Sequence, residues 1–227
     1  MEKGAEHRRI GLLVPSSNTV MEVDFYTNLP SWATVHTGRM YMEEATVAGE
    51  SRMLDEFALP AARHLATARP HVVVFGCTSA GALRGNAFDE RLRSEIAEIT
   101  KAPIVSVIRS VRQAISAAGA RKVAVITPYV EVLNARIRDS LERDGLEVVS
   151  IQGMAISVNH DIASVSPEQV VEFALRSLEG TEADLVFLSC TNFRAMEALP
   201  RLRSILSVPI LCSNEVALKA AIDALVG

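Results

Sequence analysis

The stretches FGCTS at residues 75–79 and LSCTN at residues 188–192 decide how this sequence is organised. Each places a cysteine and a threonine directly after an apolar run, HVVVF at residues 71–75 and ADLVFL at residues 183–188. Short apolar runs of this kind are typical of strands that are buried on both faces of a parallel sheet. The two stretches therefore predict two buried strands, each followed by a cysteine.

The surroundings of the two cysteines repeat with one spacing. Cys77 lies 62 positions after Pro15, and Cys190 lies 62 positions after Pro128. Each proline ends an apolar run, and each cysteine block is followed by a short apolar run that contains a proline near its start. Three matched strand ends predict an internal duplication into two similar lobes, since a solenoid would repeat every few tens of residues. The matched runs are residues 10–15 and 123–128 before the cysteines, and residues 102–106 and 208–212 after them.

Segments with apolar residues at helical spacing separate the strand-like runs, and this alternation is typical of parallel sheets flanked by helices. We predict an α/β protein with two pseudo-symmetric lobes, each a mainly parallel four-stranded sheet, and an active site in the cleft between them. Residues 1–118 form one lobe and residues 119–227 the other, and the last helix is free to cross back. Further strands are predicted at residues 34–37 and 146–151, helices at 51–68 (interrupted by Pro60), 88–99, 106–118, 134–144, 166–178 and 214–226, and a loop at 153–160.

The composition excludes several classes of protein. A formal net charge of −4, without a dense basic patch, disfavours nucleic-acid binding. No apolar run approaches the ~20 residues of a membrane span, and the charged N-terminus does not resemble a signal peptide. Three cysteines cannot all pair, and they form no zinc-binding pattern. We therefore expect a cytoplasmic protein with reduced thiols, without a metal and without a membrane partner.

The predicted positions of Cys77 and Cys190 suit acid/base chemistry. Both follow a strand at the carboxyl edge of a sheet, where the N-terminal amides of a helix bind anions and lower the pKa of a thiol. Lobes that face each other place the two thiols on opposite sides of one cleft, which suits the removal and delivery of protons at carbon. Because a second cysteine stands at the matched position, catalysis is favoured over packing. Cys212 has apolar neighbours and is expected in the core.

Polar residues near other strand ends are candidate ligands. Asn18 follows the first strand, at the edge where open α/β sheets bind their ligands, whereas Ser16 and Ser17 are expected to cap a helix that begins near residue 20. Asn159 either binds substrate or stabilises a loop turn. Tyr129 either binds substrate or packs at the lobe interface with its hydroxyl in water.

Taken together, these motifs resemble the aspartate/glutamate racemase superfamily and, within it, the maleate cis-trans isomerase branch. The resemblance extends over nearly the whole chain. The amino-acid racemases begin with a glycine-rich turn that this chain lacks, and the arylmalonate decarboxylases keep only the later cysteine. One departure is that Ala80 follows the first Cys-Thr-Ser, where the isomerases more often have glycine, so a different acid remains an open alternative. The motifs are VPSSNT (residues 14–19), GCTS (76–79), TPY (127–129), VN (158–159), SCTN (189–192) and SN (213–214).

The resemblance implies a mechanism and a site. The Cys77 thiolate would add to the double bond of maleate, the central bond would rotate, and Cys190 would deliver and later remove a proton, releasing fumarate. The resemblance implies neither a metal nor an organic cofactor. It does imply a homodimer or homotetramer. Arg194 and His160 stay outside the implied catalytic set. The implied substrate-binding residues are Asn18, Thr78, Ser79, Tyr129, Asn159 and Thr191.

Three alternatives remain open at this point. A racemase or epimerase of aspartate, glutamate or a hydantoin would use the same two thiols without a covalent adduct. An arylmalonate-type decarboxylase would leave Cys77 without a role. A binding protein for a dicarboxylate would leave both thiols packed, with ordinary pKa values and slow alkylation near neutral pH.

Overall fold

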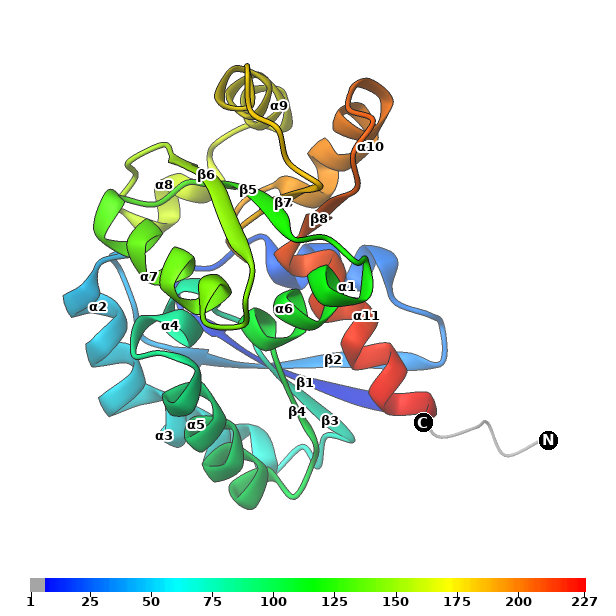
Figure 1. Ribbon diagram of the computed structural model, residues 1–227. Coiled ribbons are helices and arrows are strands. Elements are labelled where there is room, and N and C mark those ends of the chain that lie inside the picture. The colour runs from blue at the N-terminus through cyan, green and yellow to red at the C-terminus, as the bar shows by residue number, and fades with distance from the viewer. Residues whose placement is uncertain (1–6) are drawn as a thin grey trace.

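The computed structural model describes residues 7–227, which form two four-stranded sheets with every strand parallel (Figure 1). The strands are β1 (Arg8–Pro15), β2 (Ala33–Met40), β3 (Val72–Phe75), β4 (Ile104–Ser106), β5 (Lys122–Thr127), β6 (Glu147–Gly153), β7 (Leu185–Leu188) and β8 (Ile210–Cys212). The first sheet has the order β2-β1-β3-β4, and the second repeats it as β6-β5-β7-β8. The predicted architecture of two similar parallel sheets is thereby confirmed.

Helices cover these sheets, which explains why the central strands are apolar throughout. All four residues of β3 and all four of β7 are buried. A strand with no solvent-facing side gains from an apolar side chain at every position. The helices are α1 (Met21–Asn28), α2 (Val47–Arg52), η1 (Met53–Phe57), α3 (Ala58–Ala66), α4 (Thr78–Leu83), α5 (Asn86–Thr100), α6 (Val107–Ala117), α7 (Glu131–Glu142), α8 (Asn159–Ala163), α9 (Pro167–Ser177), α10 (Ala195–Ile205) and α11 (Ser213–Val226).

The two halves of the chain are packed together through helices that contact both. Helix α11 follows the last strand of the second sheet but packs against α6, β3 and β4 of the first half (Figure 1). Helix α4 packs against α7, so a second contact joins the halves. The lobe boundary at residues 118–119 stays a prediction; Gly119 lies between α6 and β5 with a φ of +70°.

Several local predictions differ from the structure. The helix expected at residues 51–68 is three segments, with the π-helical turn η1 between α2 and α3. Pro60 does not end the helical run, which continues through it to Ala66; it lies in the first turn of α3, directly after the π-helical turn. The loop expected at residues 153–160 ends in the first two residues of α8.

No helix of residues 7–227 is long and apolar enough to cross a membrane.

Candidate active site

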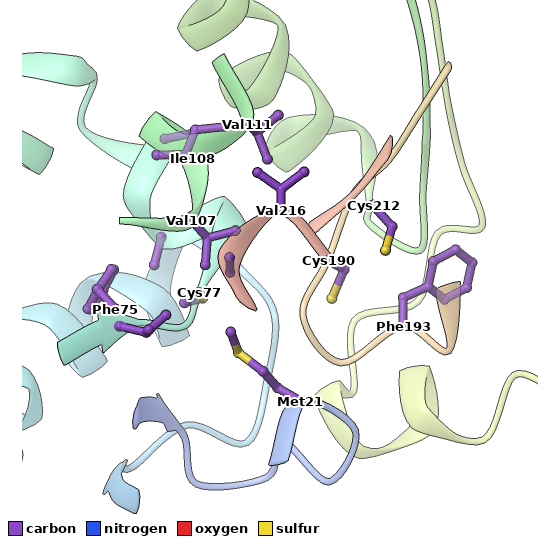
Figure 2. Packing of buried hydrophobic residues seen from close by; sticks show 14 of the residues in the cluster. Met21, Phe75, Cys77, Val107, Ile108, Val111, Cys190, Phe193, Cys212 and Val216 are labelled. Atoms are coloured by element: carbon purple, nitrogen blue, oxygen red, sulfur yellow. The ribbon is translucent and has the colours of Figure 1, made fainter. Parts of the chain in front are cut away.

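The structure brings Cys77 and Cys190 together between the two sheets. Cys77 follows β3 and directly precedes α4, and Cys190 follows β7. Figure 2 shows the two side chains at the interface between the halves, near Met21 of α1. Both thiols are buried, with exposed fractions of 5% and 4%. Their charges influence each other, since the Cys190 thiolate raises the pKa of Cys77.

The two cysteines differ in backbone conformation, although their sequences match. Cys190 has a φ of +113°, a region that favours glycine, whereas Cys77 is extended with a φ of −141°. Two contacts hold Cys190 in place: its N–H donates to Ser213 Oγ at 3.1 Å, and its Sγ accepts from the Asn192 N–H at 3.3 Å. Strained backbone of this kind is stored at functional sites.

The expectation that helix amides lower the thiol pKa values is wrong, because the pKa of each thiol is raised overall. Burial raises the pKa of Cys77 well above its usual value and that of Cys190 to about 11, and contacts with backbone amides oppose this only in part. In addition, Cys190 does not directly precede a helix, because α10 begins only at Ala195. Slow alkylation is therefore expected of a catalyst and of a binding protein alike, and only turnover separates them.

Ser213 connects the two thiol loops, and we did not predict it as a site residue. Its Oγ accepts a hydrogen bond from Thr78 Oγ1 at 2.9 Å and another from the Cys190 N–H at 3.1 Å. The SN motif at residues 213–214 was the only signal in the sequence. Thr78 is fully buried, and its hydrogen bond to Ser213 ties it to the second half of the chain.

Asn18 joins the first strand end to the second thiol loop. Its Oδ1 accepts from the N–H groups of Val20 and Met21, and its Nδ2 donates to Thr191 Oγ1 at 3.1 Å. Thr191 in turn donates to the carbonyl oxygen of Gly76, next to Cys77. Asn18 therefore accepts from the N–H groups at the start of α1 and lies between the halves, with one amide hydrogen left for a ligand.

The prediction that Ser16 and Ser17 cap this helix is wrong. Ser16 Oγ accepts from the Met42 N–H at 3.0 Å, and Ser17 Oγ donates to the Met42 carbonyl at 2.5 Å. The amide oxygen of Asn18 instead accepts from two N–H groups at the start of the helix, whose N-cap residue is Val20.

Asn159 lies at the start of α8 and is buried. Its Nδ2 donates to Ser17 Oγ at 2.8 Å, and its carbonyl oxygen accepts from Asn192 Nδ2 at 2.6 Å. The Asn159 N–H donates to the carbonyl of Glu43, beside an antiparallel bridge between Glu44 and Val158. Backbone contacts of both halves thus hold Asn159 close to the first strand end.

Tyr129, Ser79 and Glu50 connect the two thiols. Tyr129 is buried, and its hydroxyl interacts with the Cys190 thiol and the Ser79 hydroxyl. Ser79 Oγ lies 3.9 Å from Cys77 Sγ and donates to Glu50 Oε1. The alternative of a wet Tyr129 hydroxyl is therefore wrong. Nothing in the sequence singled out Glu50, which reads as an ordinary polar residue of a helix.

The two residues left outside the catalytic set form no hydrogen bond or ion pair with a thiol in the part of the chain that the structure describes. Arg194 forms an ion pair with Glu197 on α10, and His160 is exposed. Cys212 is fully buried at the end of β8, as expected of a core residue. Among residues 7–227, no three His, Cys, Asp or Glu side chains are grouped so that they could hold a metal ion.

Asp24 of α1 is buried next to the second thiol loop. It accepts from Asn214 Nδ2 at 2.7 Å, and the same nitrogen donates to the Thr191 carbonyl. Burial raises the pKa of Asp24 to about 6, and the hydrogen bond from Asn214 opposes this. The unfolded chain has a pKa of about 3.9 here, so folding favours the protonated carboxyl. The stabilisation is complete below about pH 4 and is lost as the pH rises through about 6.

Replacing Asp24 by asparagine is therefore expected to stabilise the protein at neutral pH. The gain in the free energy of unfolding is on the order of 2 kcal/mol near pH 7.5 and vanishes near pH 4, because the ionised carboxylate is then absent from both proteins. Urea unfolding at the two pH values measures it. Asp223→Asn, in an exposed ion pair with Lys219, is the control. A gain that is equal at both pH values contradicts the assignment.

The comparisons with known proteins agree with this geometry. The arylmalonate decarboxylase family model matches residues 10–226. A maleate isomerase of Geobacillus stearothermophilus is 29% identical over 221 residues, which cover 91% of this chain and 87% of that protein. The arylmalonate decarboxylase of Bordetella bronchiseptica is 26% identical over 206 residues, which cover 90% of this chain and 85% of that protein.

A solved structure has the same fold. The crystal structure of a maleate isomerase variant from Pseudomonas putida S16 with maleate superposes with a TM-score of 0.87 and 26% identity, covering 97% of this chain and 92% of that one. The similarity is not confined to one lobe or one motif. The chain belongs to the arylmalonate decarboxylase family, and it is similar to maleate isomerases along almost its whole length.

Proposed function

We propose that this protein is a cofactor-independent isomerase that converts maleate to fumarate. The observation that carries the proposal is the pair of buried thiols, Cys77 and Cys190, which reach one interface from matched positions of two similar sheets. Similarity to maleate isomerases, one of them solved with maleate, supports this substrate over others.

In the proposed reaction, Cys77 is the nucleophile and Cys190 the acid. The Cys77 thiolate adds to one carbon of the double bond, and the electron pair of that bond takes the proton of the Cys190 thiol at the other carbon. The carbons are then joined by a single bond, which rotates. The Cys190 thiolate removes a proton from the second carbon, the double bond forms again, and the C–S bond breaks to return the Cys77 thiolate.

The carboxylates of the substrate are bound by neutral donors in this proposal. Asn18 and Asn159 each use one amide hydrogen within the protein and have a second for a ligand. Thr78, Ser79 and Thr191 follow the two cysteines and, with their backbone amides, line the anion sites. The hydroxyl of Tyr129 lies beside Cys190, where it orients the substrate and stabilises the Cys190 thiolate that forms during turnover.

Proton NMR of the purified protein with maleate in D2O under reducing conditions tests the proposal. The appearance of the fumarate signal is the expected result. An inert protein overturns the maleate assignment. Uptake of deuterium at the α-carbon of aspartate, glutamate or a hydantoin would then identify the racemase, which uses the same thiols without an adduct.

A decarboxylase is the second candidate, because the matching family model and one relative are described as arylmalonate decarboxylase. Decarboxylation needs a single proton donor at carbon, which Cys190 supplies. A Cys77→Ala variant that still releases carbon dioxide from phenylmalonate would favour this candidate. Cys77 at the matched position, in electrostatic contact with Cys190, favours the isomerase instead.

A further inference from the structure

The side chain of Glu50 is completely buried, and one side chain, that of Ser79, lies between it and Cys77. Its exposed fraction is 0%, and its Oε1 accepts a hydrogen bond from Ser79 Oγ, which lies 3.9 Å from Cys77 Sγ. Its other oxygen, Oε2, is buried without a hydrogen-bond partner within residues 7–227. A buried carboxyl group with one unpaired oxygen costs stability, so its presence beside the thiols calls for a role in the site.

Among residues 7–227, no basic side chain forms an ion pair with Glu50, and its hydrogen bond comes from the neutral Ser79 hydroxyl. Arg52, two positions further along the chain, pairs with Glu56, and Arg84, at the end of α4, pairs with Asp55. The charge of Glu50 acts on the two thiols: when Glu50 is ionised, it raises the pKa of both Cys77 and Cys190.

Within residues 7–227 the buried ionisable side chains other than cysteine and tyrosine are acidic, namely Asp24, Glu50 and Asp89. An ionised Glu50 would face a thiolate and a substrate with two carboxylates in a poorly screened interior. Burial raises the pKa of Glu50 to about 8, and the Ser79 hydroxyl opposes this shift.

We propose that Glu50 is a positioning residue that works in its protonated form. As a neutral acid it holds Ser79 beside Cys77 and leaves the site free of protein charge; its ionisation opposes both the Cys77 thiolate and the binding of a dicarboxylate. Glu50 acts through Ser79 and through its charge, and it does not react with substrate. The part that concerns the dicarboxylate rests on the proposed function, whereas the part that concerns Cys77 does not.

The direction of the pH dependence follows from this role. As the pH rises through about 8, Glu50 loses its proton, and its negative charge raises the pKa of Cys77. The rise in pH by itself favours the Cys77 thiolate, so the ionisation of Glu50 opposes this effect of pH. Replacing Glu50 by glutamine keeps a neutral group that accepts from Ser79 at every pH. The variant is expected to form the Cys77 thiolate at a lower pH, by about one unit or more for two charges separated by a single side chain.

The experiment is an ultraviolet titration of the thiolate in the free protein. The absorbance of each protein minus that of its Cys77→Ala counterpart gives the pKa of Cys77, in the natural chain and in Glu50→Gln. Glu56→Gln, an exposed side chain of η1, is the matched control and is expected to leave the midpoint unchanged. A midpoint that stays in place or rises in Glu50→Gln overturns the proposal, because it would mean that the carboxylate is absent or assists deprotonation.

A second measurement does not depend on the folding of a variant. Infrared spectra of the natural protein are expected to show a protonated carboxyl band near neutral pH that is lost as the pH passes about 8. A protein whose carboxyl groups are all ionised near neutral pH contradicts the proposal. Neither measurement uses a substrate, so an inert protein in the maleate assay leaves this test intact. If maleate is turned over, Glu50→Gln is expected to retain its kcat/KM at alkaline pH, where that of the natural enzyme falls.

Discussion

Replacing Cys190 by serine is expected to stop turnover and to leave one maleate-derived group on Cys77. The serine hydroxyl is too weak a base to take the proton back from carbon, so the adduct that forms slowly cannot eliminate. Replacing Cys77 by alanine removes the nucleophile itself and is expected to lower kcat by ~10⁴-fold or more without any adduct. Mass spectrometry of the intact proteins and of their peptides, after incubation with maleate, separates the two variants.

Cys212→Ala is the matched control for both variants. Cys212 is a third buried cysteine at the end of β8, directly before Ser213, and its thiol takes no part in the proposed chemistry. Its replacement is expected to cost some stability and to leave kcat close to that of the natural protein. An adduct on Cys190 in the Cys77→Ala variant would reverse the assigned roles. Equal turnover in all three variants would refute thiol catalysis.

The fold could be predicted because its signals repeat in the sequence. Strands buried on both faces are apolar at every position, and the spacing of 62 residues from proline to cysteine occurs twice. Helix boundaries follow less directly from the sequence. The π-helical turn at η1 has no sequence signal, and the position of Pro60 within its helix depends on where that helix begins.

The site could be predicted in part, and the gaps have physical reasons. The two thiols and Asn18 follow strand ends, which the topology brings to one edge. Glu50 and Ser213 depend on packing between segments far apart in the chain, 29 and 135 positions from the residues they contact. The φ of Cys190 is set by its tertiary contacts with Ser213 and Asn192, so two matching sequences gave two conformations.

Replacing Tyr129 by phenylalanine is expected to give the second largest loss of activity. The hydroxyl of Tyr129 interacts with the Cys190 thiol, and this contact opposes the rise in the pKa of Cys190 that burial causes. Without it, the Cys190 thiolate formed during turnover loses its neighbouring donor in a buried site, so kcat is expected to fall by ~10²-fold. The pKa of Cys190 is expected to rise, measured as the thiolate absorbance that is lost in a matching Cys190→Ala protein.

The expected pattern separates this role from simple binding of substrate. A phenylalanine fills nearly the same volume, so the fold is preserved. The control for loss of a tyrosine hydroxyl is Tyr26→Phe, at a residue that is 60% exposed. If Tyr129 only orients a carboxylate, the loss appears in KM and the pKa of Cys190 does not move. A lower kcat together with a higher pKa of Cys190 instead places the hydroxyl of Tyr129 in the proton-transfer step. The reason is that loss of a group that stabilises the thiolate slows the step in which that thiolate forms.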